Sequence, residues 1–459
     1  MSVTVTQAYR FALDPTPAQE RDLASHAGAA RVAFNWALAR VRAVLGQRAA
    51  ERSYGIAEEL LTPPLSWTLP ALRREWNAAK DEVAPWWRAN SKESYSSGLD
   101  ACARGLKNWS DARKGQRAGR PVGFPRFRSK RRTTPSVRFT TGTIRVEGDR
   151  HHVTLPRLGP LKLHESARKL ARRLDNGTAR ILSATVRREA GRWFVSFTCQ
   201  VQRRQRRPRQ PDAVVGVDVG VRHLAVLSTG ELVDNPRHLG TASRRLRRLA
   251  KAASRKVGPD RRTGQRPSNR WERARRALAA AHRRVADLRR DGLHKLTTRL
   301  AGEYGTVVIE DLNVAGMVRN RRLAKAISDC GFGELRRQLD YKTSWGGGRL
   351  AVADRWYPSS KTCSGCGAVK AKLPLRIRTF TCQRCGMVAD RDFNAARNLA
   401  QLVVAGSGPE TKNGRGADRK THSSGPVAAK RQPRTASAGK TGTVPPQGGT
   451  VDQELTHAH

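Results

Sequence analysis

The segment VVGVDVG, which runs from Val214 to Gly220, is a short apolar run that carries one carboxylate, Asp218. A short apolar run bounded by turn-forming residues predicts a buried strand. A carboxylate on such a strand is costly unless it is paired with a cation or bound to a metal. Asp218 is therefore the first candidate functional residue of the chain.

Two further acids stand on apolar elements downstream of this strand. Glu310 closes the predicted strand 306–310 (TVVIE), and Asp392 opens the last predicted helix within ADRDFNAARN. The intervening patterns predict further strands, a pair of long helices and another helix over 323–341. This order of strands, helices and acids is that of a ribonuclease H-like nuclease core, in which the three acids come together. We therefore predict an α/β domain of this class that begins at residue 213.

Three converging carboxylates require cations, and hard oxygen ligands suit Mg²⁺. Two such ions, roughly 3.5–4 Å apart, would activate water and stabilise the leaving oxygen of a phosphodiester. We expect Asp218, Glu310 and Asp392 to be both the catalytic residues and the magnesium ligands. Taken singly, they could be a turn residue, a strand-end acid and a helix N-cap. Asp311 and Asp390 compete for the second and third positions. Glu310 is preferred because it continues the alternation of its strand, and Asp392 because it directly precedes a helix.

Four of the seven cysteines form two CxxC pairs with fifteen residues between the pairs. Two such pairs supply four thiolates to one tetrahedral Zn²⁺, which is the closed arrangement of a structural site. The predicted zinc ligands are Cys363, Cys366, Cys382 and Cys385. The remaining cysteines, Cys102, Cys199 and Cys330, are isolated and are expected in cores.

The N-terminal half begins with a strand, continues with helices and ends with several strands. The first dozen residues alternate polar and apolar side chains, and DPTP ends this predicted strand. Between residues 18 and 115 apolar residues recur every three or four positions, which predicts helices around a tryptophan-rich core; the alternative for some of the tryptophans is stacking on bases. Four segments between 136 and 201 predict the strands of a small barrel or sandwich: RFTTGTIRVEG, HHVTLP, ARILSATVRRE and RWFVSFTCQV.

The chain has 88 Lys and Arg against 38 Asp and Glu, a formal net charge of +50. A charge of this size favours a polyanionic partner, and nucleic acid before a membrane surface. No segment contains the roughly 20 consecutive apolar residues that a membrane-spanning helix needs. The N-terminus also lacks the apolar block of a secretory signal.

The positive charge is concentrated in a loop and in a predicted helical hairpin. The loop, 116–133, alternates arginines with Phe124 and Phe127, a pattern that suits phosphate contact and base stacking; a solvated linker is the alternative. The hairpin, 237–300, has an apolar seam. Between Asn235 and Arg290 there are 19 Lys and Arg but 3 acids, which favours a nucleic-acid-facing arm. The predicted nucleic-acid contacts are Arg126, Arg128, Arg244, Arg245, Arg247, Arg248, Arg275, Arg276, Arg283 and Arg284.

Several of these motifs together resemble the TnpB (OrfB) family of transposon-encoded, RNA-guided DNA nucleases. The matching stretches, which cover about residues 5–403, are YRFALDPTPAQ, HAGAARVAFNWAL, GFPRFRSK, GVDVGVRHLAVLS, VVIEDLNVAGMVRN, LDYKTSWGGGRLAVADRWYPSSKTCSGCG and CQRCGMVADRDFNAARN. PSSKTCSGCG and DRDFNAARN are the most specific of them. The family's catalytic acids correspond to Asp218, Glu310 and Asp392, and its zinc ligands to the four paired cysteines.

The resemblance implies a multidomain α+β and α/β chain. Its parts would be a wedge-like split β-barrel with an inserted helical recognition lobe, a RuvC-like nuclease domain with an inserted zinc ribbon, and a tail. The boundaries are 1–17 for the first barrel strand, 18–115 for the lobe, 116–135 for a basic loop, 136–201 for the rest of the barrel, 202–212 for a basic linker, 213–356 for the nuclease core, 357–389 for the zinc ribbon, 390–404 for the last nuclease helix and 405–459 for a disordered basic tail.

The resemblance also implies partners: a guide RNA transcribed from the transposon end, and double-stranded target DNA. The expected setting is a prokaryotic cytoplasm, in association with the nucleoid. Two other functions remain open. A relative that has lost a catalytic acid could act as an RNA-guided DNA-binding regulator, and the older family label suggests an accessory protein or enzyme of transposition. The intact set of three acids favours the nuclease.

Overall fold

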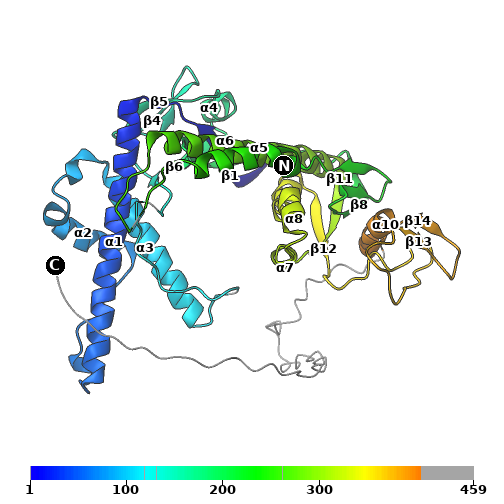
Figure 1. Cartoon of the computed structure of the whole chain (residues 1–459), viewed down its shortest axis with the longest axis horizontal. Helices are drawn as coiled ribbons and strands as arrows, with labels where there is room; N and C mark the ends of the chain where they lie inside the picture. Colours follow the sequence, from blue (N-terminus) through cyan, green and yellow to red (C-terminus); the bar gives the residue numbers. More distant parts are fainter. Residues whose placement is uncertain (1, 118, 131, 261, 405–459) are drawn as a thin grey trace. The chain divides into compact units, whose positions relative to one another are not determined.

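The computed structural model describes residues 2–117, 119–130, 132–260 and 262–404. Within these residues no helix has the length and apolar character needed to cross a membrane. The predicted disordered tail, 405–459, lies outside the described residues. Figure 1 shows the arrangement of the elements along the chain.

The first region contains two antiparallel sheets that share one hydrophobic core. One sheet has the order β1-β7-β6-β2 and the other the order β3-β4-β5, and an isolated bridge between Leu13 and Leu163 links them. Buried side chains of both sheets meet, with Phe139, Trp193 and Phe197 among the largest. The strands are β1 (Ser2–Ala12), β2 (Ser136–Phe139), β3 (Arg145–Val146), β4 (His152–Leu155), β5 (Gly159–Lys162), β6 (Ala179–Glu189) and β7 (Arg192–Arg204).

Three predictions for this region need correction. The strand expected over 138–148 is two short strands, because Gly142 takes a positive φ of 81° that a strand residue does not adopt. The linker expected at 202–212 shrinks to 205–209, since β7 continues to Arg204 and β8 (Gln210–Asp218) already begins at Gln210. Helix α4 (Arg168–Asp175) was not predicted; its buried residues are Leu170 and Ala171, which give little apolar pattern.

The helical region consists of α1 (Pro17–Ser53), α2 (Leu69–Val83) and α3 (Lys92–Arg113), with short 3-10 turns at Glu58–Leu60 and Trp87–Ala89. Thr16 starts α1 with a capping box in which its hydroxyl accepts from the Gln19 amide and the Gln19 side chain accepts from the Thr16 amide. Four tryptophans, Trp36, Trp67, Trp76 and Trp87, pack in the core of this region, and Trp36 meets Trp76 edge-on at 5.2 Å.

The second region is built on a five-stranded mixed sheet of order β10-β9-β8-β11-β12. Strands β8, β11 and β12 are parallel to one another, and the other pairs are antiparallel. The strands besides β8 are β9 (His223–Leu227), β10 (Leu232–Asp234), β11 (Tyr304–Glu310) and β12 (Arg349–Ala353).

Helices cover both faces of this sheet. Val217 and Ile309 face a core built with α6, α8 and α9, whereas Val308 and Leu399 belong to a core on the other face, under α10. The helices are α5 (His238–Ser254), α6 (Asn269–Glu303), α7 (Val314–Met317), α8 (Ala324–Cys330), α9 (Phe332–Gly346) and α10 (Arg391–Val404).

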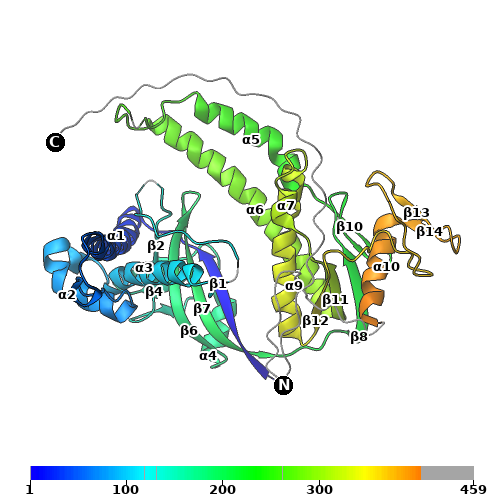
Figure 2. The ribbon, with the colours of Figure 1, turned by 90° about the horizontal axis from the view of Figure 1, so that it is seen from below.

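Helices α5 and α6 form the hairpin predicted from the apolar spacing, and they run side by side in Figure 2. Leu246 of α5 packs with Leu278 and Val285 of α6 along the seam. Between β12 and α10 lies a small cysteine-containing insert with one antiparallel pair, β13 (Thr379–Thr381) and β14 (Val388–Asp390).

Candidate active site and zinc centre

Asp218 and Glu310 lie at the carboxyl ends of adjacent parallel strands. The register pairs Val217 of β8 with Ile309 of β11, so the next residue on each strand is one of the two acids. Side chains alternate along a strand, and Val217 and Ile309 both face the core under α9. Asp218 and Glu310 therefore point to the opposite face, which is the face that α10 covers.

A glycine lets α10 approach this face closely. A Cβ at Gly216 would lie 1.9 Å from the carbonyl oxygen of Ala396 and 2.6 Å from the amide nitrogen of Ala400, so only glycine fits. Gly216 shares its face with Asp218, two residues further along β8. The backbone contact therefore carries the first turn of α10, which contains Asp392, towards the two strand-end acids.

Glu310 and Asp392 act electrostatically on Asp218. Burial, followed by the negative charges of Glu310 and Asp392, raises the pKa of Asp218 well above its ordinary value. The buried guanidinium of Arg391 acts in the opposite direction but does not outweigh them. Such mutual repulsion is relieved by a cation, and carboxylate oxygens are the ligands that Mg²⁺ prefers. The chemistry of the three side chains suits a divalent cation, and in this structure their oxygens do not all lie within 4.8 Å of one another.

Two of the acids also contact the segment that leads into and through the cysteine insert. The hydroxyl of Ser359 donates a hydrogen bond to Oε1 of Glu310. Asp392 pairs with Arg378, whose Nη1 lies 3.5 Å from its Oδ1. Sequence reasoning missed Ser359, Arg378 and Gly216, because their roles depend on contacts with distant parts of the chain.

The two competing acids are engaged elsewhere. Asp311 is held between two guanidinium groups, those of Arg336 and Arg355. Asp390 caps α10, since its Oδ1 accepts hydrogen bonds from the amides of residues 392 and 393 at 2.8 and 3.1 Å. Both acids therefore have structural partners. Among the acids that raise the pKa of Asp218, Glu310 has the largest effect, Asp392 the next and Asp390 a smaller one.

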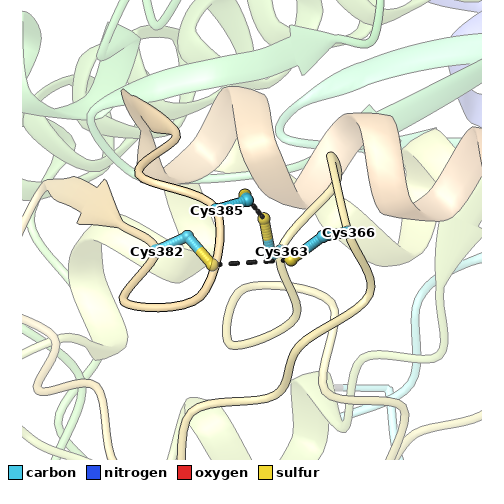
Figure 3. Close-up of side chains that lie close together, drawn as sticks. All are labelled: Cys363, Cys366, Cys382 and Cys385. Carbon is cyan, nitrogen blue, oxygen red and sulfur yellow. Dashed lines mark hydrogen bonds between the residues drawn. The ribbon is translucent and has the colours of Figure 1, made fainter.

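The four paired cysteines meet at one point, as Figure 3 shows. Their sulfur atoms all lie within 4.8 Å of one another, and Cys363 to Cys385 and Cys366 to Cys382 are each 3.6 Å apart. Four sulfurs at about 2.3 Å from a tetrahedral Zn²⁺ would be about 3.8 Å apart, which agrees with this spacing. The four side chains therefore fit a closed zinc site.

The two CxxC segments have the same backbone geometry. Each ends in a glycine of positive φ, Gly367 at 75° and Gly386 at 71°, whose amide donates to the carbonyl of the first cysteine of its pair. Backbone amides favour the thiolate form as well. Hydrogen bonding from the amide of Cys385, and then from that of Arg384, lowers the pKa of Cys382 to about 6.

Side chains of α10 anchor the first CxxC segment. Asn394 accepts from the amide of Ser364 at 2.9 Å and donates to the carbonyl of Thr362 at 2.7 Å. Asn398 donates to the carbonyls of Ser359 and Thr362, each at 2.7 Å. Both asparagines are buried. The DRDFNAARN motif therefore places Asp392 and the two asparagines that hold the first CxxC segment on one helix.

The predicted nucleic-acid arginines fall into two groups. All four on α5, Arg244, Arg245, Arg247 and Arg248, are exposed, as are Arg275, Arg276 and Arg284 on α6. Arg126 is exposed too. Arg128 and Arg283 are half-buried instead: the Arg128 guanidinium lies 3.7 Å from the centre of the Phe34 ring, and Arg283 donates to the carbonyl of Ala190 at 3.0 Å.

A large basic cavity was not anticipated from the sequence. It has a volume of about 1520 Å³ and is bordered by β1, α4, the end of β7, the 205–209 connection, α6 and α9. Aromatic rings take part in it, since Tyr341 and Trp345 pack 4.5 Å apart and Arg203 lies 4.5 Å above the Trp345 ring. Its cationic lining residues are Arg10, Lys169, Arg173, Arg203, Arg204, Arg206, Arg337 and Lys342.

Comparison with known protein families gives three matches along the chain. Residues 196–321 match a family described as "Probable transposase", residues 332–399 match "Cas12f1-like, TNB domain", and residues 1–48 match "Helix-turn-helix domain". In the structure the last of these segments is strand β1 followed by most of the single long helix α1.

Similar proteins span the chain from end to end. A protein of Mycobacterium tuberculosis strain H37Rv named "Putative RNA-guided DNA endonuclease" is 42% identical over 96% of both chains. A protein of the same name from Streptomyces pristinaespiralis is 35% identical and covers 96% of this chain and 99% of its own. A solved Cas12f1–sgRNA–target DNA complex is 13% identical with a TM-score of 0.44, covering 86% of this chain and 99% of that one.

The matched families and the cysteine cluster define a transposase-type protein with a small insert whose four cysteines could hold zinc. The chain belongs to the TnpB (OrfB) family.

Proposed function

We propose that this protein is a transposon-encoded, RNA-guided DNA endonuclease whose cleavage depends on Mg²⁺. The observation that carries the proposal is the electrostatic coupling of Asp218 to Glu310 and Asp392 at one end of the sheet. A buried acid whose pKa is raised by neighbouring carboxylates is expected where the acids share a cation. The names of the relatives from Mycobacterium tuberculosis and Streptomyces pristinaespiralis agree with this activity.

The three acids would hold the catalytic magnesium, two ions by the usual arrangement for phosphodiester hydrolysis. When bound, the metal supplies an activated water and stabilises charge on the leaving oxygen. The protein's own contribution is to hold the ligands: two strands fix Asp218 and Glu310, and α10 fixes Asp392. The pKa of Asp218 is raised above the ordinary aspartate value of about 3.9, so this carboxyl binds a proton more tightly than usual. A metal ion would have to displace that proton in order to bind.

The positive surfaces suit the RNA and the DNA that such an enzyme must hold. The cavity beside β7 and α9 offers cations for phosphates and the Tyr341–Trp345 pair for bases, and the exposed arginines of α5 and α6 add a second basic surface. In an RNA-guided nuclease base pairing reads the sequence, while the protein contacts the backbones. We propose that the guide RNA comes from the transposon end and that the cysteine centre holds one structural Zn²⁺.

The second candidate is an RNA-guided DNA-binding regulator without cleavage. It would need RNA and DNA contacts but no metal-binding acids. The retention of all three acids, with Asp311 and Asp390 occupied by other partners, favours the nuclease.

The test is cleavage of DNA matched to the co-purified RNA. Asp218→Ala and Asp392→Ala are expected to abolish cleavage while RNA binding stays at the level of the unaltered protein. Asp390→Ala is the control: loss of the helix cap should lower stability by about 1 kcal/mol while cleavage is retained. Cleavage by Asp218→Ala would contradict the assignment of the active site to these acids, and the absence of any bound RNA would contradict the guide.

A further inference from the structure

A buried serine joins the candidate active site to the segment that enters the zinc ribbon. Ser359 is 3% exposed and lies four residues before the first zinc ligand, Cys363. Its hydroxyl donates to Oε1 of Glu310, which comes from a strand 49 residues away in sequence. A donor in this position restricts rotation of the Glu310 carboxylate and leaves Oε2 free of that bond.

The serine is itself held on both sides. Its amide donates to the carbonyl of Tyr357 at 2.9 Å, and its carbonyl accepts from Nδ2 of Asn398 at 2.7 Å. Asn398 is 2% exposed and sits on α10, the helix that carries Asp392 in its first turn. One helix therefore fixes Asp392 directly and Glu310 through Ser359.

We propose that Ser359 is a positioning residue of the active site, which orients Glu310 as a metal ligand, and that Asn398 holds Ser359 in place. The inference rests on the proposed nuclease function. It adds two residues, Ser359 and Asn398, that are not themselves proposed as metal ligands. Partners that orient metal ligands commonly change metal affinity or activity by about 10–100-fold when they are removed.

The same segment supplies a matched control. Ser364 is also buried, at 4% exposure, and its hydroxyl faces the sulfur of Met387 at 3.7 Å rather than an acid. Ser359→Ala and Ser364→Ala each remove one buried hydroxyl from the same loop. A loss of cleavage caused by loop packing alone would appear in both variants, whereas a loss of carboxylate orientation would appear only in Ser359→Ala.

The experiment measures cleavage rate by the RNA-bound protein against Mg²⁺ concentration. Ser359→Ala is expected to need a higher Mg²⁺ concentration and to cleave about 10–100-fold more slowly when Mg²⁺ is limiting. Mn²⁺ should restore part of this loss, and Ser359→Thr, which keeps the hydroxyl, should restore most of it. Melting temperature and RNA binding should match those of Ser364→Ala.

Thermal melting with added Mn²⁺ gives a readout that needs no cleavage. Mn²⁺ bound at the acids should raise the melting temperature, and this rise should be smaller in Ser359→Ala than in Ser364→Ala. Equal Mg²⁺ dependence and equal Mn²⁺ shifts in the two variants would overturn the role of Ser359. An unaltered protein that never cleaves would instead contradict the proposed function, and the Mn²⁺ shift would still decide whether Ser359 supports a metal site.

Discussion

At the scale of single residues, neighbouring acids have different partners because their side chains point in different directions. Four acids stand in two pairs that are close in sequence, Glu310 with Asp311 and Asp390 with Asp392, and the members of each pair have different partners. Asp311 is held by two arginines and Asp390 caps a helix, while Glu310 and Asp392 affect the charge state of Asp218. Strand alternation places Glu310 on the same face of the sheet as Asp218, because alternate residues face opposite sides of a sheet.

The raised pKa of Asp218 gives a prediction about stability. An acid whose pKa is raised by folding prefers to be protonated in the folded state, so its ionised form destabilises the fold above that pKa. In buffer without magnesium, Asp218→Asn should therefore melt at a higher temperature than the unaltered protein at pH 7.5. The difference should shrink as the pH falls through the raised pKa towards the ordinary value of about 3.9.

Melting curves between pH 5 and 8, without chelator so that zinc is retained, would measure this effect. Asp311→Asn is the contrasting variant, because it loses two ion pairs and should melt lower at pH 7.5. A lower melting temperature for Asp218→Asn at pH 7.5 would contradict the idea that Asp218 is electrostatically strained.

At the scale of elements, the contact of β8 with α10 depends on one missing methyl group. Gly216→Ala would place a Cβ 1.9 Å from the Ala396 carbonyl oxygen, and neither backbone can move without disturbing the sheet or the helix. We expect a loss of about 3 kcal/mol or more in the free energy of unfolding, measured by chemical denaturation.

Gly292→Ala is the matched control for this substitution. Gly292 lies inside α6 with no atom within 4 Å of its added Cβ, so alanine should stabilise the helix by about 0.5–1 kcal/mol. If the two alanine variants had equal stability, the close approach of α10 to β8 would be wrong.

The cysteine insert is a second element whose stability can be tested. Cys363→Ser should abolish binding of one zinc per chain and make residues 357–390 sensitive to trypsin, because the insert has only a small core around Phe380. Metal analysis and limited proteolysis would measure both effects. The control is Cys102→Ala, which changes a cysteine in the helical lobe; this variant should still bind one zinc per chain at the four paired cysteines. Unchanged proteolysis after zinc loss would contradict a structural role.

At the scale of the whole molecule, the net charge of +50 predicts strongly salt-dependent RNA binding. Replacing the four exposed α5 arginines by glutamine should reduce the slope of log affinity against log salt by up to about 3, at roughly 0.7–0.9 for each phosphate that an arginine neutralises. The same four arginines replaced by lysine should retain most of the slope. Equal slopes for the glutamine and lysine variants would exclude α5 from the RNA-binding surface. The four positions are Arg244, Arg245, Arg247 and Arg248.

Much of the architecture could be predicted because many strands and helices show local patterns of apolar residues. The alternation of β6 and β7, the apolar seam of α5 and α6 and the spacing of the cysteines each depend on neighbouring residues alone. Helix α4 was missed because two buried residues in a highly charged segment leave almost no periodicity. The end of β7 was misplaced because its last residues, on an exposed arginine-rich stretch, are held by pairing with β1 rather than by their own propensity.

The sequence by itself determined which residues could carry chemistry: three acids on apolar elements, four cysteines in two pairs, and an excess of arginine in a helical hairpin. The tertiary structure decided which of these residues lie close together and which other side chains contact them. Glu310 and Ser359, Asn398 and Ser359, and the cations of the basic cavity are separated by tens to hundreds of residues in the chain. Such contacts arise from the order of strands in the sheet and from the packing of α10 against Gly216, and no local periodicity encodes them.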